Sequence, residues 1–213
     1  MEKELAEMDA QGVFEWYFIP LDSNLITCKW IFVTKWNANG SLNKYKARLV
    51  ARGFTQVHGL DYFDTFAPTV CLTAIRAMLA IANSSSMVCH SLHINTAFLH
   101  APLPDNCRCF MHAPPGYVPP ANKASNCVRL RKALYGLKQT PCEWNHTLVL
   151  FLTEQLGFTQ LFSEPSVFFK GAGDDFIAIS VHVDDQTIIS RFLPPVISLK
   201  HALANRFNRR SPV

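Results

Sequence analysis

The stretch Phe176-Ile-Ala-Ile-Ser-Val-His-Val-Asp-Asp-Gln-Thr-Ile-Ile189 places two adjacent carboxylates in an otherwise apolar sequence. Its β-branched residues predict two strands, with Asp184 and Asp185 at the tip of a tight hairpin between them. Adjacent carboxylates repel each other unless a cation neutralises them, and Mg²⁺ binds one or two carboxylates. From the spacing alone two interpretations stay open, a metal site or a second ordinary turn.

A first aspartate pair, Asp174-Asp175, follows Gly171-Ala-Gly173 between two strand-like runs. Glycine and aspartate favour turns because glycine tolerates positive φ and aspartate bonds its own backbone. This pair therefore predicts a solvated hairpin turn.

Strand and helix patterns are mixed along the chain without internal repeats, which predicts a fold that contains both helices and strands. Runs rich in β-branched and aromatic residues predict strands, and apolar residues at helical spacing predict helices. The first two strands form a hairpin around the turn residues 37–40. Residues 113–126, rich in Pro, Ala and Asn, predict a loop. The predicted strands are 28–33, 45–51, 88–94, 166–170 and 176–183, and the predicted helices are 72–83, 141–156 and 195–207.

The composition predicts a folded protein. Of 213 residues, 49% are hydrophobic and 17% charged, which excludes wholesale disorder. Apolar runs fall short of about 18 residues, so no membrane span is expected. The N-terminus lacks the apolar segment of a signal peptide, and the seven cysteines include no Cys-x-x-Cys pair. We expect reduced thiols and a cytoplasmic or nuclear location.

Positive charge is concentrated in three stretches that contain no acidic residue. Residues 29–60, 106–142 and 186–213 hold 17 of the 20 lysines and arginines. In the return strand of the first hairpin, Lys46 and Arg48 share one face because side chains alternate along a strand. Two interpretations stay open, a polyanion such as nucleic acid or ordinary solvated surfaces.

Several blocks of sequence occur in a characteristic order over about residues 12 to 210. They resemble the reverse transcriptases of copia-type LTR retrotransposons. The blocks are Trp30-Ile-Phe with Tyr45-Lys-Ala-Arg-Leu-Val-Ala-Arg-Gly-Phe-Thr-Gln56, Asp61-Tyr-Phe-Asp-Thr-Phe-Ala-Pro68, Asn95-Thr-Ala-Phe-Leu-His100, Pro114-Pro-Gly-Tyr117, Leu130-Arg-Lys-Ala-Leu-Tyr-Gly-Leu-Lys-Gln139 and Val183-Asp-Asp185.

The resemblance implies an α+β fingers–palm fold and RNA-directed DNA polymerisation. It implies RNA or DNA template–primer and dNTPs as partners, two Mg²⁺ ions as cofactor, and no membrane. It divides the chain into an N-terminal segment at 1–28, a fingers hairpin and helix at 29–88, and a palm at 89–213. The palm would carry a fingers insertion at about 103–133 and end before the thumb and RNase H.

The resemblance also implies roles for single residues. The family's Tyr-x-Asp-Asp motif matches His182-Val-Asp-Asp185, so Asp184 and Asp185 are the expected catalytic magnesium ligands. The positions that match the family's dNTP- and template-binding segments are Lys46, Arg48, Tyr135, Gly136 and Gln139. For Gly136 we expect a place where the backbone approaches a ligand closely.

One position departs from the family pattern. The first metal-binding aspartate of the family is His93 here, in Leu92-His93-Ile94. Neutral imidazole supplies one nitrogen and no negative charge, whereas Mg²⁺ prefers oxygen ligands. We expect a loss of roughly 10³-fold in rate, and hence a degenerate, catalytically impaired fragment. Three alternatives remain: a non-catalytic nucleic-acid-binding remnant, a zinc or manganese site made by His93, Asp184 and Asp185, and a chain that does not fold stably.

Overall fold

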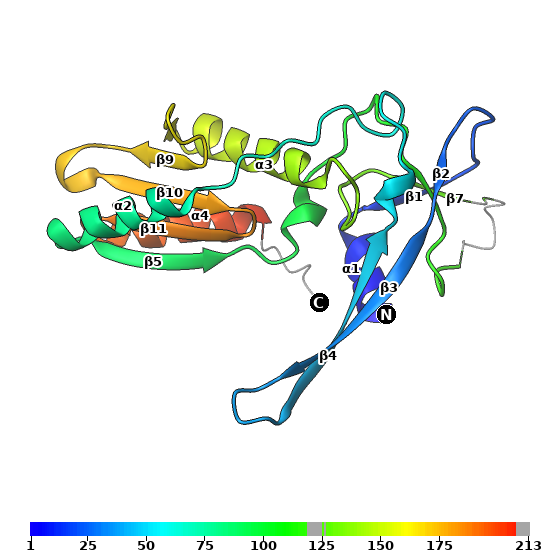
Figure 1. Ribbon diagram of the computed structural model, residues 1–213, viewed down its shortest axis with the longest axis horizontal. Helices are drawn as coiled ribbons and strands as arrows, with labels where there is room; N and C mark the ends of the chain where they lie inside the picture. Colours follow the sequence, from blue (N-terminus) through cyan, green and yellow to red (C-terminus); the bar gives the residue numbers. More distant parts are fainter. Residues whose placement is uncertain (119–124, 126, 208–213) are drawn as a thin grey trace. The chain divides into compact units, whose positions relative to one another are not determined.

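The computed structural model describes residues 1–118, 125 and 127–207, which form two compact units (Figure 1). Unit 1 comprises Met1–Phe66 and Phe98–Glu143, and unit 2 comprises Ala67–Ala97 and Trp144–Val213. Both units contain helices and strands, which confirms the predicted α+β class.

Unit 1 combines a long β-hairpin, a small sheet and one helix. The hairpin pairs β3 (Cys28–Trp36) antiparallel with β4 (Leu42–Ala51), as predicted, but it is longer than the sequence pattern indicated. Helix α1 (Glu2–Ala10) buries Leu5 and Met8. The sheet has the order β1-β7-β6-β2, with bounds Phe14–Tyr17, Cys127–Leu130, Phe110–His112 and Leu25–Ile26.

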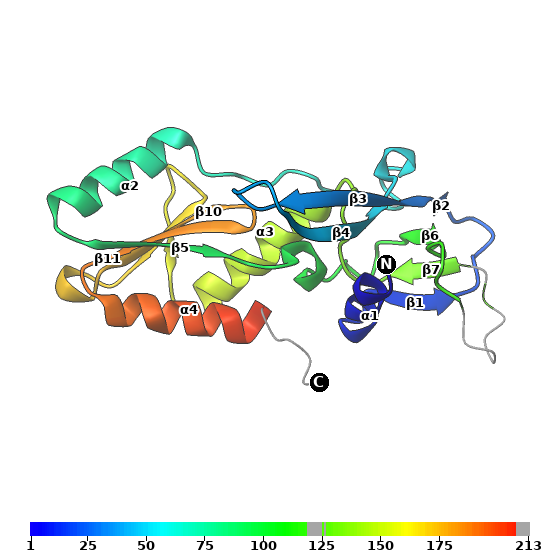
Figure 2. The ribbon, with the colours of Figure 1, turned by 90° about the horizontal axis from the view of Figure 1, so that it is seen from below.

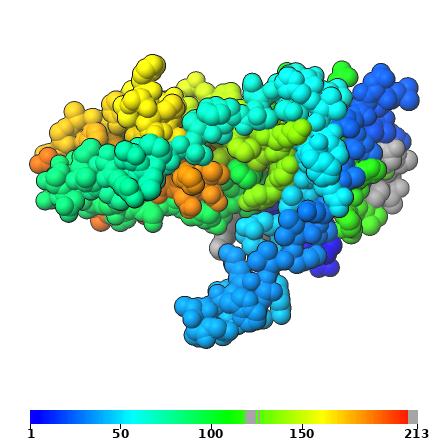
Figure 3. Space-filling model, viewed as in Figure 1, coloured from blue at the N-terminus to red at the C-terminus, as the bar shows by residue number. Residues whose placement is uncertain are grey.

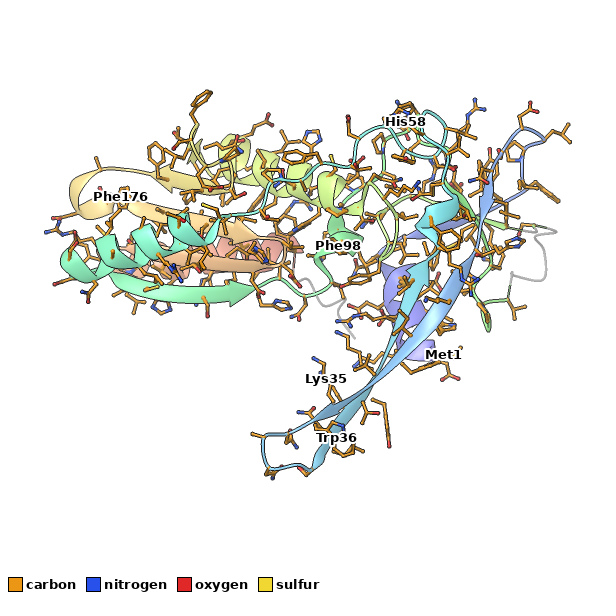
Figure 4. The ribbon with its side chains drawn as sticks, in the orientation of Figure 1. Met1, Lys35, Trp36, His58, Phe98 and Phe176 are labelled. Carbon is orange, nitrogen blue, oxygen red and sulfur yellow. The ribbon has the colours of Figure 1, made fainter. Side chains whose placement is uncertain are left out.

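The hairpin presents two chemically different faces because side chains alternate along each strand. Lys44, Lys46 and Arg48 lie on one face of β4, and Tyr45 lies on the other face with Phe32 of β3. The tip of the hairpin stands clear of the rest of unit 1 (Figure 3). Figure 4 labels Lys35 and Trp36, whose side chains project from this outer part of the hairpin.

Unit 2 is a five-stranded antiparallel sheet covered by helices on both faces. Helix α2 (Leu72–Ser84) lies on one face, and α3 (Thr140–Leu150, in unit 2 from Trp144) and α4 (Leu193–Phe207) lie on the other (Figure 2). The strand order is β5-β11-β10-β9-β8, with bounds Val88–His93, Asp185–Ser190, Ile177–His182, Val167–Lys170 and Thr159–Gln160.

The core of unit 2 explains why the central strands are apolar on both sides. Strand β10 is buried at every position except its last residue, His182. Ala178 and Ile189 face α2 and pack with Met78 and Ala82. Strands covered by helices on both faces favour apolar residues, which fits the mostly apolar sequence of β10.

Most of the predicted elements are confirmed within a few residues. Short helical turns complete the structure: a π-helical end of α3 at Phe151–Gln155, and 3-10 turns at Gly53–Thr55, Ala97–His100 and Gly173–Asp175. The sequence pattern missed α1 and the four-stranded sheet of unit 1. The predicted loop at 113–126 lies partly outside the described residues.

The boundaries of the two units differ from the domain ranges that the family resemblance implies. Residues 103–133, predicted as a fingers insertion, belong to unit 1 with the hairpin. Helix α2 lies within the predicted fingers range 29–88, but it packs in unit 2 against β11 and β5. Within the described residues, no helix has both the length and the apolarity that crossing a membrane would require.

Candidate functional site

A cluster of three ligand-type side chains lies at one end of the unit 2 sheet. Strand β5 places His93 directly opposite Asp185 of β11, and Asp184 lies in the turn between β10 and β11. The His93 Nδ1 atom is 2.9 Å from Asp185 Oδ1 and 3.7 Å from Asp184 Oδ2. The structure thus brings together the three residues that the sequence singled out.

The turn that carries the carboxylates is tight and strained. Val183 has a φ of 59°, a left-handed conformation that β-branched residues rarely adopt. Two hydrogen bonds hold the turn in place: Trp144 Nε1 donates to the Val183 carbonyl at 2.7 Å, and Ile94 N donates to the Asp184 carbonyl at 2.9 Å. The carboxylates are therefore presented by a fixed backbone rather than by a free loop.

The three side chains are open to solvent. Their exposed side-chain fractions are 53% for His93, 41% for Asp184 and 68% for Asp185. Within the described ranges, no lysine or arginine forms an ion pair with either aspartate. One potential ligand atom from each residue lies within 4.8 Å of the others, which is close enough for one shared ion.

The donor set does not fit the two-magnesium arrangement that the family resemblance implies. That arrangement needs a carboxylate on β5 to bridge two ions, and the residue there is histidine. A neutral imidazole has one acceptor nitrogen, so it does not bridge, and it adds no negative charge. Only Asp184 and Asp185 supply the oxygen ligands that Mg²⁺ prefers.

The predicted dNTP-binding cations lie in unit 1, on the basic face of the hairpin. Burial, together with the positive charges of Arg48 and Lys35, lowers the pKa of the Lys46 ammonium. The Arg48 guanidinium lies 5.6 Å from the centroid of the Tyr135 ring, a cation–π distance. Its Nε is buried and has no hydrogen-bond partner among the described residues.

Packing against the hairpin by itself requires glycine at position 136. Its φ is +90°, and an added Cβ would lie 2.1 Å from the Ala51 carbonyl oxygen and 2.7 Å from Val50. Ala51 N donates to the Tyr135 carbonyl, and Gly53 N donates to the Gly136 carbonyl. The observed close approach that demands glycine is to β4, and the predicted approach to a ligand stays a prediction.

Gln139 lies in the interior of unit 1. Its side chain is 1% exposed, and its Nε2 donates to the Asp61 carbonyl while its Oε1 accepts from Gln56. Both ends of the amide are occupied by the protein, so the structure gives Gln139 a role in packing. Its predicted contact with template or nucleotide stays a prediction.

Two residues that matter for the site regions were not singled out from the sequence. Trp144 lies within the predicted helix at 141–156, and its indole N–H anchors the Val183 turn. A buried tryptophan usually finds a partner for its N–H, which is the signal that could have marked it. Asp61 is fully buried, and its Oδ2 accepts from Asn24 and from the Val57 backbone.

Comparison with known proteins identifies the family. The model of the family described as reverse transcriptase (RNA-dependent DNA polymerase) matches residues 12–211. The match spans both units and includes the hairpin, the β10–β11 turn and His93. The chain belongs to this reverse transcriptase family.

Similar proteins are Pol polyproteins of plant transposons. The chain is 40% identical over 210 residues to the retrovirus-related Pol polyprotein from transposon RE2 of Arabidopsis thaliana, covering 95% of this chain and 14% of that protein. It is 41% identical over 184 residues to the polyprotein from transposon RE1 of the same plant (84% and 12%). It is 33% identical over 211 residues to the one from transposon TNT 1-94 of Nicotiana tabacum (99% and 16%).

These comparisons confirm the resemblance to copia-type retrotransposon Pol polyproteins. The chain spans between 12% and 16% of the length of these three relatives. It therefore corresponds to the reverse transcriptase part of a much longer kind of protein.

Proposed function

We propose that this chain is the fingers and palm of a retrotransposon reverse transcriptase whose RNA-directed DNA synthesis is impaired. The β3–β4 hairpin of unit 1 is assigned to the fingers, and the five-stranded sheet of unit 2 to the palm. The observation that carries the impairment is His93, which stands opposite Asp185 where the family has an aspartate.

The assigned partners are a template–primer and dNTPs. The cations Lys46 and Arg48 share one face of β4, and the Arg48 Nε is a buried donor without a partner in the described residues. The lowered pKa of Lys46 reflects burial and repulsion by neighbouring cations, and a bound triphosphate would relieve that repulsion. Charge-assisted hydrogen bonds to phosphate are stronger than hydrogen bonds between neutral groups.

The impairment follows from the missing carboxylate. In the proposed palm, Asp184 and Asp185 remain as magnesium ligands, but the third carboxylate is absent. Two-ion phosphoryl transfer depends on the ions that stabilise the attacking and leaving oxygens. Losing about 4 kcal/mol of that stabilisation corresponds to roughly 10³-fold in rate.

Primer extension on an RNA template tests the proposal. The unaltered chain and its His93→Asp variant are compared with Mg²⁺ and separately with Mn²⁺. We expect no measurable synthesis by the unaltered chain with Mg²⁺ and a gain on the order of 10³-fold for His93→Asp. Efficient Mg²⁺-dependent synthesis by the unaltered chain would show that the proposed impairment is wrong.

A double variant provides the matched control. Adding Asp184→Asn to His93→Asp removes a carboxylate again while leaving the restored one, so any regained synthesis should disappear. If His93→Asp does not extend a primer either, this chain alone is not a polymerase, and the second candidate function applies.

The second candidate is non-catalytic nucleic-acid binding. The observation that favours it is the basic face of the hairpin, where Lys44, Lys46 and Arg48 follow one another on one side of β4. Each phosphate contact should contribute a slope of about −0.9 to the dependence of log affinity on log salt for duplex DNA. Replacing Lys46 and Arg48 by alanine should flatten that slope by about two, and salt-independent binding would contradict this candidate.

A further inference from the structure

Histidine at position 93 changes which ion the adjacent aspartates can share. His93 Nδ1 lies 2.9 Å from Asp185 Oδ1 and 3.7 Å from Asp184 Oδ2. Ligand atoms bound tetrahedrally at about 2.0–2.1 Å from one ion lie about 3.3–3.4 Å apart. The observed separations fall on either side of that value, so small rotations of three exposed side chains bring them to it.

The chemistry of the donors favours a transition-metal ion over magnesium. Imidazole nitrogen suits zinc and related ions, whereas Mg²⁺ takes oxygen ligands almost exclusively. One histidine and two carboxylates also leave room for water, as in zinc sites with three protein ligands. The exposure of all three side chains keeps this fourth position open to solvent.

The backbone holds the three ligands without help from an ion. His93 and Asp185 are opposite each other in the β5–β11 register, and the turn is fixed by Trp144 and by Ile94 N. No arginine or lysine in the described part of the chain forms an ion pair with the carboxylates. A cation that enters therefore meets two carboxylates that are held on fixed backbone.

We infer that His93, Asp184 and Asp185 form a three-ligand site for a single transition-metal ion of the zinc class, in preference to Mg²⁺. His93 binds through Nδ1, and each aspartate binds through one carboxylate oxygen. The site uses the residues of the proposed palm, but the inference does not depend on polymerisation. Zinc binding and primer extension can succeed or fail separately.

The test is a ZnCl₂ titration of the full chain labelled with ¹⁵N-histidine, followed by the NMR shifts of the imidazole nitrogens. The chain has eight histidines, so the responding ring is assigned with His93→Gln. We expect the His93 Nδ1 signal to shift at stoichiometric zinc. A tenfold excess of MgCl₂ should leave that shift in place. The seven free cysteines can also bind zinc, and reading histidine nitrogens separates the two events.

His182→Gln is the matched control. His182 is exposed and lies opposite Asp185 on the other neighbouring strand, but it does not belong to the three-residue cluster. We expect His182→Gln to retain the zinc affinity and His93→Gln to weaken it by roughly tenfold or more. His93→Asp, which restores an oxygen donor, should reduce the preference for zinc over magnesium.

Three results would overturn the inference. The first is the absence of any response of His93 at stoichiometric zinc. The second is complete displacement of zinc by the MgCl₂ excess, and the third is loss of binding in His182→Gln with retention in His93→Gln. The second is measured on the unaltered chain, and for the first a lack of response by every histidine at stoichiometric zinc is enough, so neither depends on how a variant folds.

Discussion

Strand β10 has an aspartate pair at each end, and the two pairs differ in their neighbours. Asp174-Asp175 lies in the turn before β10, and Asp184-Asp185 lies at the turn after it. Asp174 is accompanied by a cation, since Arg191 Nε lies 3.3 Å from its Oδ1. The second pair is accompanied by His93, a potential metal ligand whose Nδ1 lies 2.9 Å from Asp185 Oδ1.

The difference shows that an aspartate pair becomes a candidate metal site when the sheet brings a third ligand, here His93, beside it. The first turn relies on glycines at positive φ, whereas the second forces Val183 to a φ of 59°. Strain of this kind persists only where surrounding contacts over-determine the backbone, and it is common at functional sites. Trp144 and Ile94 supply those contacts at the second turn.

The largest expected contrast is in zinc affinity. Replacing both Asp184 and Asp185 by asparagine removes two anionic ligands, so the dissociation constant should rise by about 100-fold, or about 2.7 kcal/mol. The same change at Asp174 and Asp175 should alter it less than about twofold, because in the described part of the chain no third ligand-type side chain joins that pair. Competition with a chromophoric chelator measures both variants, and equal losses would remove the distinction between the two turns.

The next contrast concerns the backbone of the first turn. Gly171 has a φ of +73°, and an added Cβ would lie 2.4 Å from the Asp175 carbonyl oxygen. Gly171→Ala should lower the free energy of unfolding by about 2 kcal/mol or more, since positive φ and a backbone clash both oppose it. Urea denaturation measures the loss.

Gly173→Ala is the control for that variant. Its φ is +57°, but nothing lies within 4 Å of an added Cβ. Only the conformational penalty of about 1 kcal/mol should remain. Equal destabilisation by both alanines would contradict the role given to the Asp175 carbonyl.

A smaller effect is expected where the second turn is anchored. Trp144→Phe keeps an aromatic ring against Phe207 but removes the hydrogen bond to the Val183 carbonyl. The free energy of unfolding should fall by about 1–2 kcal/mol. Zinc affinity should fall severalfold as well, because the turn loses one of its anchors. A variant that unfolds earlier in urea but binds zinc unchanged would show that Trp144 stabilises the fold without positioning the ligands.

The smallest expected effect is that of the ion pair at the first turn. Arg191 and Asp174 are exposed by 49% and 76% of their side chains, so solvent screens their attraction. Arg191→Ala should change the free energy of unfolding by no more than about 0.5 kcal/mol. A loss above about 1 kcal/mol in urea denaturation would mean that this turn is more tightly organised than its exposure indicates.

Elements with a strong local pattern were predictable from the sequence. Helices α2 and α4 and the two hairpins have periodic apolar residues and turn residues at the expected places, and the structure confirms them. The small sheet of unit 1 was not predictable in this way. Its strands contain two to four residues, and β1 pairs with β7 from far along the chain. A strand that short has too few positions to show a period.

The structural role of single residues could also be seen only in the structure. Gln139 matches a segment that suggested ligand contacts, but protein groups occupy both ends of its amide, and Gly136 packs closely against β4. Whether a backbone approaches a ligand or another strand depends on packing between distant segments. Sequence patterns carry no direct record of that packing.

By itself, the sequence determined the family through the order of its blocks, the basic face of the hairpin through strand alternation, and the identity of the three candidate ligands. Only the tertiary structure decided that His93 stands opposite Asp185, 92 positions away, with the Val183 turn held by Trp144. The reason is physical: alternation sets which way a side chain points on its own strand, but its neighbours follow from cross-strand register and helix packing. Both arise from contacts between segments that are remote in the chain.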